Sequence, residues 1–229
     1  MAELPDEKKT VADKLLRDAL IAVWPSMWSI NTAEQLDTAV DESGMGLPPS
    51  NPHLVDTKPS KDAVCLALAH SSVETASATG VIGMGRTMVW YNLAGIKCSK
   101  AEQAKYDYVF TSTTEWVSED AAAKILARGP AFAKAVQRAG GQVQVLVFGS
   151  TKSEICCFRA FQSLGAGCLF YLGRIKTFYK SAWPFLAAGN VASYVSALKK
   201  MNYFTASEAS YKALVQKNFM TYQGKYDTL

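Results

Sequence analysis

One stretch of this chain, residues 60 to 74, limits the possible folds more than any other, because it predicts a helix buried on every side. Ser60 has the side chain of an N-cap, and Asp62 lies in the first turn, where the helix dipole favours negative charge. The run from Ala63 to Ala69 carries no polar side chain, so no face of this helix suits contact with water. Such a helix belongs inside a domain, surrounded by other elements.

The same helix ends at a carboxylate, Glu74. An acid in the last turn of a buried helix meets the negative end of the helix dipole and an apolar wall, and both raise its pKa. A carboxylic acid that keeps its proton near neutral pH can protonate a leaving glycosidic oxygen. Glu74 is therefore a candidate general acid, unless it only marks the solvated end of the helix. His70, four residues earlier on the same face, could touch this acid or simply pack beside it.

Five segments of the chain follow one another in an order that carries a resemblance: residues 68–76, 92–97, 113–116, 158–163 and 202–205. In this order they are similar to Leu-Ala-Gln-Ala-Ala-Leu-Glu-Ser-Gly, Asn-Leu-Phe-Gly-Ile-Lys, Thr-Thr-Glu-Tyr, Phe-Arg-Ala-Tyr with a following serine, and Gly-Tyr-Ala-Thr. These are segments of the glucosaminidase family of peptidoglycan hydrolases (glycoside hydrolase family 73), which includes the hydrolase domain of the flagellar rod protein, and the chain resembles that family. Each match alone is weak, and the resemblance depends on their order across about residues 59 to 215.

The resemblance implies a mainly α, α+β fold: a lysozyme-like helical domain with a small β-hairpin lobe that lines a substrate groove. It implies that Glu74 is the general acid. It also implies that Glu115, on the hairpin, is the second carboxylate, which positions water or supports an oxocarbenium-like transition state. Tyr203 matches a tyrosine that the family places at the cleft.

Substrate contacts are expected from Tyr91, Asn92 and Trp116. The chain departs from the family after Glu74, where Ala76 and Ser77 replace the usual glycine and aromatic residue. A stacking contact with a sugar would then have to come from Trp90, Tyr91 or Trp116.

The expected reaction is hydrolysis of the β-1,4 bond between N-acetylglucosamine and N-acetylmuramic acid, with peptidoglycan glycan strands as partner and no metal or cofactor. One alternative is a lytic transglycosylase, which also uses one glutamate at a helix end; residues 83–88 resemble a segment of that family. Another is an inactive structural or wall-binding protein of the same fold.

Glu42 is a second candidate for the acid, because residues 41–46 resemble the family's Glu-Ser-Gly-Trp-Gly. However, Glu42 lies 50 residues before Asn92, whereas Glu74 lies 18 residues before it, close to the short loop of the family. Glu42 also precedes a loop rich in proline, with Pro48, Pro49, Pro52 and Pro59, and not the loop that contains Gly80, Gly83 and Gly85. We therefore prefer Glu74.

We predict a single domain over residues 1–229. The resemblance, which starts at about residue 59, implies a helical N-terminal extension at 1–58. It also implies an insertion at 119–154, because the family usually joins its Thr-Thr-Glu segment to its Phe-Arg strand through a short turn. Predicted helices cover 8–24, 32–40, 60–74, a pair within 119–139 broken at Gly129-Pro130, 164–179, 182–188, 191–201 and a last helix from Thr205 with Glu208 completing a capping box. Predicted strands cover 106–116, 142–148 and 155–161, with Arg159 placed to reach a carboxylate.

Composition excludes several other classes of protein. The chain is 49% apolar with a mean hydropathy near zero, as in globular proteins. Its net charge of +4 is spread along the chain, which suits an anionic polymer such as a cell wall but is too weak to predict nucleic-acid binding. No apolar run reaches the roughly 18 residues of a membrane helix, so membrane insertion is not expected.

The cysteines and histidines argue against zinc enzymes and cysteine peptidases. The five cysteines include no CxxC pair and are expected to be reduced core residues, and the chain has only two histidines. The N-terminus shows no hydrophobic core of a signal peptide, which predicts synthesis in the cytoplasm without ordinary export. A phage lysin or a virion-associated wall-degrading protein fits this setting, and a virion would add tail or baseplate proteins as partners.

Overall fold

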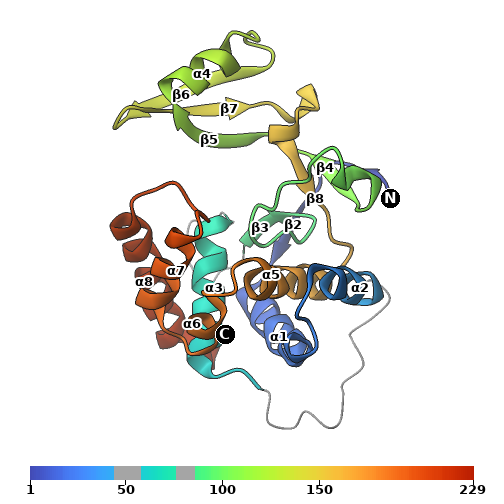
Figure 1. The fold of residues 1–229 in the computed structure, drawn as a ribbon, viewed down its shortest axis with the longest axis vertical. Helices are drawn as coiled ribbons and strands as arrows, with labels where there is room; N and C mark the ends of the chain where they lie inside the picture. The colour runs from blue at the N-terminus through green and yellow to red at the C-terminus, as the bar shows by residue number, and fades with distance from the viewer. Residues whose placement is uncertain (44–57, 76–85) are drawn as a thin grey trace. The chain divides into compact units, whose positions relative to one another are not determined.

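The computed structural model describes residues 1–43, 58–75 and 86–229 (Figure 1). The described residues form eight α-helices and three small sheets, so the protein is a mixed α and β structure. Two compact units are present: a β-rich unit of Met1–Glu7 and Gly95–Ala160, and a helical unit of Lys8–Ala94 and Phe161–Leu229. The single domain over 1–229 stays a prediction.

The centre of the helical unit is α3, Lys61–Glu74. Its residues from Ala63 to Ser71 are all buried, and the Ser60 hydroxyl accepts a hydrogen bond from the Ala63 N–H at 3.1 Å. The helices α1 (Asp13–Val23), α6 (Trp183–Ala187) and α8 (Glu208–Lys225) pack against it. The predicted buried helix and its N-cap are therefore confirmed.

The other helices of this unit complete the shell. The helix α5 (Leu164–Phe178) packs against α1 and α2 (Ala33–Ser43), and α7 (Val191–Lys200) packs against α8. These bounds confirm the helices predicted over 32–40, 164–179, 182–188 and 191–201 to within a few residues. Among the described residues of both units, short 3₁₀ helices cover Trp24–Trp28, Glu102–Ala104, Gly149–Thr151, Glu154–Cys156 and Tyr226–Thr228.

Two predictions at the ends of helices are wrong. Residues 8–11 are not helical but form β2 (Lys8–Val11), antiparallel to β3 (Arg86–Val89), because pairing with a distant strand outweighs local helix propensity. The last helix begins after Ser207, whose hydroxyl accepts a hydrogen bond from the Ser210 N–H at 3.1 Å. Glu208 contacts the Ser196 hydroxyl and does not complete a capping box with Thr205.

The β-rich unit contains two of the sheets. In the first, β1 (Glu3–Leu4) runs parallel to β4 (Tyr108–Phe110), which is antiparallel to β8 (Cys157–Arg159). In the second, β5 (Thr113–Ser118) and β6 (Ala133–Ala139) flank β7 (Gln142–Val147), and all pairs are antiparallel. The helix α4 (Glu119–Leu126) packs on this second sheet.

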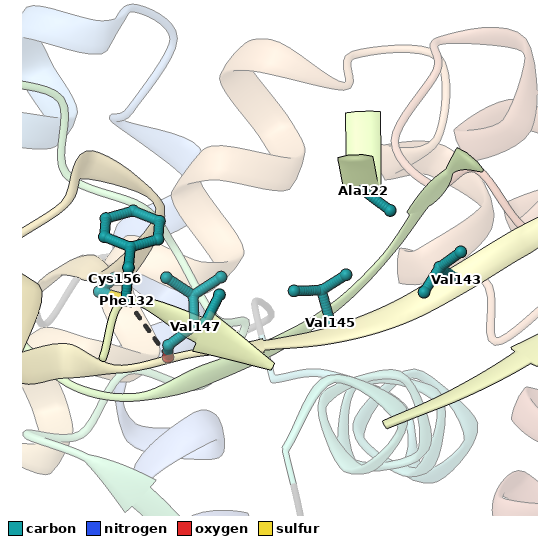
Figure 2. Close-up of a cluster of buried hydrophobic side chains, with 7 residues drawn as sticks. Ala122, Phe132, Val143, Val145, Val147 and Cys156 are labelled. Atoms are coloured by element: carbon teal, nitrogen blue, oxygen red, sulfur yellow. Dashed lines mark hydrogen bonds between the residues drawn. The ribbon is translucent and has the colours of Figure 1, made fainter. Parts of the chain in front are cut away.

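A small apolar core joins α4 to the second sheet (Figure 2). Valine side chains on β7 point toward Ala122 of α4, and the Cys156 thiol lies 3.5 Å from the Val147 carbonyl oxygen. The core consists of Ala122, Phe132, Ala133, Val143, Val145, Val147 and Cys156. This core fixes β7, and through the ladder it fixes the neighbouring strand β5.

Two strand predictions in this unit need correction. The strands β4 and β5 belong to different sheets, so residues 106–116 do not form one strand of a hairpin. The second half of the predicted helix pair at 119–139 is the strand β6, joined to β7 by Gly140 and Gly141, which have φ of +57° and +72°. Two glycines with positive φ are typical of a tight hairpin turn. The predicted insertion 119–154 thus supplies two of the three strands in the sheet that carries Glu115.

Candidate active site

The end of α3 places Glu74 in a partly buried position. The Thr75 N–H and hydroxyl both donate to the Ser71 carbonyl, at 3.0 and 2.7 Å, which fixes the last turn. The side chain of Glu74 is 22% exposed. Its Oε1 accepts a hydrogen bond from the hydroxyl of Tyr211 on α8. The carboxyl group is therefore held by a neighbouring helix while part of it still reaches the surface.

Burial raises the pKa of Glu74 to about 7, although the hydrogen bond from Tyr211 favours the ionised form and acts in the opposite direction. A raised pKa for Glu74 agrees with the expectation from the sequence. At neutral pH a large fraction of Glu74 carries a proton. The group can therefore give a proton to a substrate oxygen, which an ordinary surface glutamate cannot do at this pH.

Beside Glu74 lies His70, which is fully buried among tyrosines. Its Nδ1 is 2.7 Å from the Tyr171 hydroxyl oxygen and 2.9 Å from that of Tyr194. Its Nε2 is 3.8 Å from Glu74 Oε1. Burial lowers the pKa of His70 to about 3, so the imidazole is neutral and does not form an ion pair with Glu74.

Tyr203 lies in the same cluster. Its ring centroid is 5.1 Å from that of His70 and 4.9 Å from that of Tyr179. The Tyr203 N–H donates to the Leu198 carbonyl at 3.0 Å, which fixes the residue just after α7. Burial raises the pKa of its phenol well above the usual range, so Tyr203 is a neutral hydroxyl. The structure thus brings two predicted catalytic residues, Glu74 and Tyr203, to the same buried histidine.

Sequence reasoning missed Tyr211, the direct partner of Glu74. The residue lies on the buried face of α8, among apolar and aromatic side chains repeated at helical spacing: Tyr211, Val215, Phe219 and Tyr222. That pattern predicts core packing and gives no sign of a contact with a carboxylate. Phe204 stacks on the Tyr211 ring at 3.9 Å between centroids and so helps to fix it.

The predicted sugar-binding residues Tyr91 and Asn92 belong to a strained turn. Trp90 and Tyr91 have φ of 42° and 55°, and the Asn92 N–H donates to the Val89 carbonyl at 2.9 Å. Bulky residues in the left-handed region store strain, and such strain gathers at functional sites. Trp90 and Tyr91 are half-buried, whereas Asn92 is 3% exposed. Contact with a sugar is therefore open to the two aromatic residues, while Asn92 lies inside the fold.

This turn is pressed against α5. A Cβ added at Gly167 would lie 2.1 Å from the Tyr91 carbonyl oxygen, so only glycine permits this approach. The Phe161 N–H donates to the Trp90 carbonyl at 2.9 Å. The backbone around Trp90 and Tyr91 is thus fixed from two directions.

In the β-rich unit, Glu115 lies within β5 and not at the end of a hairpin. Its Oε1 accepts hydrogen bonds from Lys97 Nζ at 2.7 Å and Thr113 Oγ1 at 3.1 Å. Lys97 also donates to the Ile155 carbonyl at 2.6 Å. Glu115 opens into a pocket of about 410 Å³ lined by Lys97, Glu115, Val117, Ile125, Glu154 and Ile155.

The remaining candidates are placed as follows. Trp116, next to Glu115 on β5, is 38% exposed. Glu42 belongs to α2, but its side chain lies outside the description, as do Ala76, Ser77 and the rest of residues 76–85. Arg159 reaches the carboxylate of Glu102 at 3.3 Å, as predicted.

All five cysteines are free and buried. Within residues 1–43, 58–75 and 86–229, no group of three or more histidine, cysteine, aspartate or glutamate side chains could hold a metal ion. In the same residues, none of the helices is both long and apolar enough to span a bilayer.

Comparison of the chain with models of protein families, with curated proteins and with solved structures finds no match. Any function proposed for the chain must therefore rest on the chemistry of these residues.

The substitution Tyr211→Phe should raise the midpoint of Glu74 ionisation by about one pH unit, because the hydrogen bond that favours the carboxylate is lost. The titration of the Glu74 carboxyl carbon, followed by NMR, measures this change. Tyr226→Phe, on a tyrosine of the same unit that contacts Arg17 and Lys61, serves as the control and should leave the midpoint in place. An unchanged midpoint in Tyr211→Phe would show that the contact is absent in solution.

Proposed function

We propose that the protein is a peptidoglycan hydrolase that cleaves the β-1,4 bond between N-acetylglucosamine and N-acetylmuramic acid. The observation that carries the proposal is the state of Glu74: a partly exposed carboxyl at the end of a buried helix, with a pKa raised to about 7 by burial. In the proposed mechanism Glu74 donates its proton to the leaving glycosidic oxygen. Departure of that oxygen leaves an oxocarbenium-like sugar that water attacks.

Glu115 is the proposed second carboxylate, which orients the attacking water or stabilises the positive charge on the sugar. Its hydrogen bonds to Lys97 and Thr113 hold one carboxylate oxygen in a defined position. Tyr203 is the proposed partner of the substrate or of the water, since its neutral phenol can donate a hydrogen bond. Tyr91 and Trp116 are the proposed aromatic contacts for sugar rings; Asn92 would support the turn.

The proposal includes a setting, in which the protein is made in the cytoplasm and acts on the wall as a phage lysin or as a virion-associated protein. Glycan strands of peptidoglycan are then the partner, and tail or baseplate proteins join them in a virion. Detection of the chain in purified virions would separate the two cases.

A lytic transglycosylase is the second candidate. Glu74, Tyr211, His70 and Tyr203 all belong to the helical unit, and a transglycosylase needs only one carboxylate. In that reaction the 6-hydroxyl of the muramic residue replaces water and an anhydro-sugar forms. The two candidates therefore differ in whether Glu115 is required.

Mass spectrometry of the soluble products from purified peptidoglycan tests the proposal. Wild type should release fragments with reducing N-acetylglucosamine ends, and both Glu74→Gln and Glu115→Gln should lose them. Glu154→Gln, which removes an exposed carboxylate of the same pocket as Glu115, is the matched control and should keep them. Anhydro-muramic ends that disappear only in Glu74→Gln would establish the transglycosylase. A folded wild type that releases nothing would leave a structural or wall-binding role.

A further inference from the structure

The buried nitrogen Nε2 of His70 has no hydrogen-bond partner among the described residues, although the side chain is 0% exposed. Buried polar nitrogens are nearly always paired, so an unpaired one requires an explanation. The nearby acceptor is Oε1 of Glu74, at 3.8 Å, which is longer than a hydrogen bond. The nitrogen thus faces a carboxyl group whose charge is expected to change.

The other contacts of His70 indicate which nitrogen carries the proton. Nδ1 lies within hydrogen-bond distance of the hydroxyls of Tyr171 and Tyr194. The Tyr171 hydroxyl donates to the Ala67 carbonyl at 3.3 Å, and the Tyr194 hydroxyl can donate to Nδ1. Oε1 of Glu74 accepts the hydroxyl of Tyr211, so we place the acid proton on the other oxygen, Oε2. An Nε2 that faces the accepting oxygen Oε1 has to be a donor. The arrangement therefore favours the neutral tautomer with the proton on Nε2.

We infer that His70 is a positioning residue for Glu74, and that its Nε2–H donates to Oε1 when the carboxyl group has lost its proton. While Glu74 is neutral the contact stays long. When negative charge develops on Oε1, the attraction shortens the contact and stabilises the carboxylate. The Nε2 proton stays on the imidazole throughout, and the proton of Glu74 goes to the substrate oxygen.

The surroundings of His70 suit this role. The groups that face it are Glu74 on its own helix, Tyr171 on α5, Tyr194 on α7, Tyr203 after α7 and Tyr211 on α8. All four phenols hold the ring without adding charge. The ring is thus fixed in orientation and neutral, as a donor with a single target requires. Only the benefit to catalysis rests on the proposed function; the contact itself does not.

NMR of the ¹⁵N-histidine-labelled protein tests the contact directly. The chain has two histidines, so a His53→Gln variant assigns the His70 signals. We expect a neutral ring with the proton on Nε2, and an Nε2 shift that follows the titration of Glu74 with a midpoint near 7. In Glu74→Gln this response should vanish. A proton on Nδ1, or an Nε2 shift that ignores the Glu74 titration, would overturn the inference.

Two substitutions of His70 separate the hydrogen bond from simple packing. His70→Phe keeps an aromatic ring but removes the N–H, whereas His70→Gln places an amide N–H near the position of Nε2. We expect His70→Phe to raise the midpoint of Glu74 ionisation and to lower kcat about tenfold with KM unchanged, and His70→Gln to restore both in large part. Equal behaviour of the two folded variants would contradict the inference. If the wild type proves inactive, the two NMR titrations still decide the contact, so the two proposals fail separately.

Discussion

Glu74→Gln should lower the rate at which soluble fragments leave purified peptidoglycan by about 10²- to 10⁴-fold, the usual contribution of a general acid. Glutamine has nearly the same shape and can still accept the hydrogen bond from Tyr211, but it has no proton to give to the leaving oxygen. The rate is measured with saturating peptidoglycan at several pH values. Since the acid has to be protonated, wild-type activity should fall as the pH rises through about 7.

The control for this prediction is Glu42→Gln, which removes the other candidate acid. It should keep wild-type activity and the same alkaline decline. If Glu42→Gln loses activity while Glu74→Gln stays folded and active, the general acid is Glu42 on α2 and not Glu74 on α3. An alkaline decline that survives in the residual activity of Glu74→Gln would show that another group sets the pH dependence.

The part of this site that the sequence predicts is the part fixed by local chemistry. The apolar run from Ala63 to Ala69, the cap at Ser60 and the acid at the end of the helix lie within one short segment, and all three were predicted correctly. The raised pKa of Glu74 follows from the same segment, because burial and position on the helix are both readable there. The environment of an acid at the end of a buried helix can thus be predicted from the sequence of that helix.

Contacts between distant parts of the chain are harder to predict from the sequence than local features are. Tyr211 lies 137 residues from Glu74, and the spacing of side chains on α8 indicates only that it is buried. Likewise, Lys8–Val11 forms a strand because it pairs with β3. The sequence of those four residues does not indicate which strand they pair with. Strand pairing depends on the neighbour more than on intrinsic propensity. The strand β6 could have been predicted, because the pair Gly140-Gly141 is a sequence signal for a tight hairpin turn.

His70 shows how one residue changes meaning between sequence and structure. Its spacing from Glu74 predicts a possible contact, but the pattern equally suits a histidine packed in a core. Only the structure shows that Nδ1 lies within hydrogen-bond distance of two phenol hydroxyls while Nε2 faces the acid. The function of the residue therefore depends on three other helices, which no pattern within α3 reveals.

The same substitution that removes activity, Glu74→Gln, should stabilise the protein above pH 7. The Glu74 pKa is about 7 in the folded protein against an ordinary 4.5, so the folded state holds the proton more tightly. Stability due to this group is fully present below pH 4.5 and is lost as the pH rises through 7, for a total of about 3 kcal/mol. Glutamine does not ionise and does not suffer this loss.

Urea unfolding of both proteins at pH 4.5 and pH 8 measures the effect. The free energies of unfolding should be nearly equal at the lower pH, and the variant should be more stable by about 3 kcal/mol at the higher pH. His70 is present in both proteins, so its own contribution in acid cancels in the comparison. A difference that is the same at both pH values would mean that Glu74 has an ordinary pKa. A substitution that removes activity and at the same time stabilises the fold is expected at a residue that is retained for catalysis at the expense of stability.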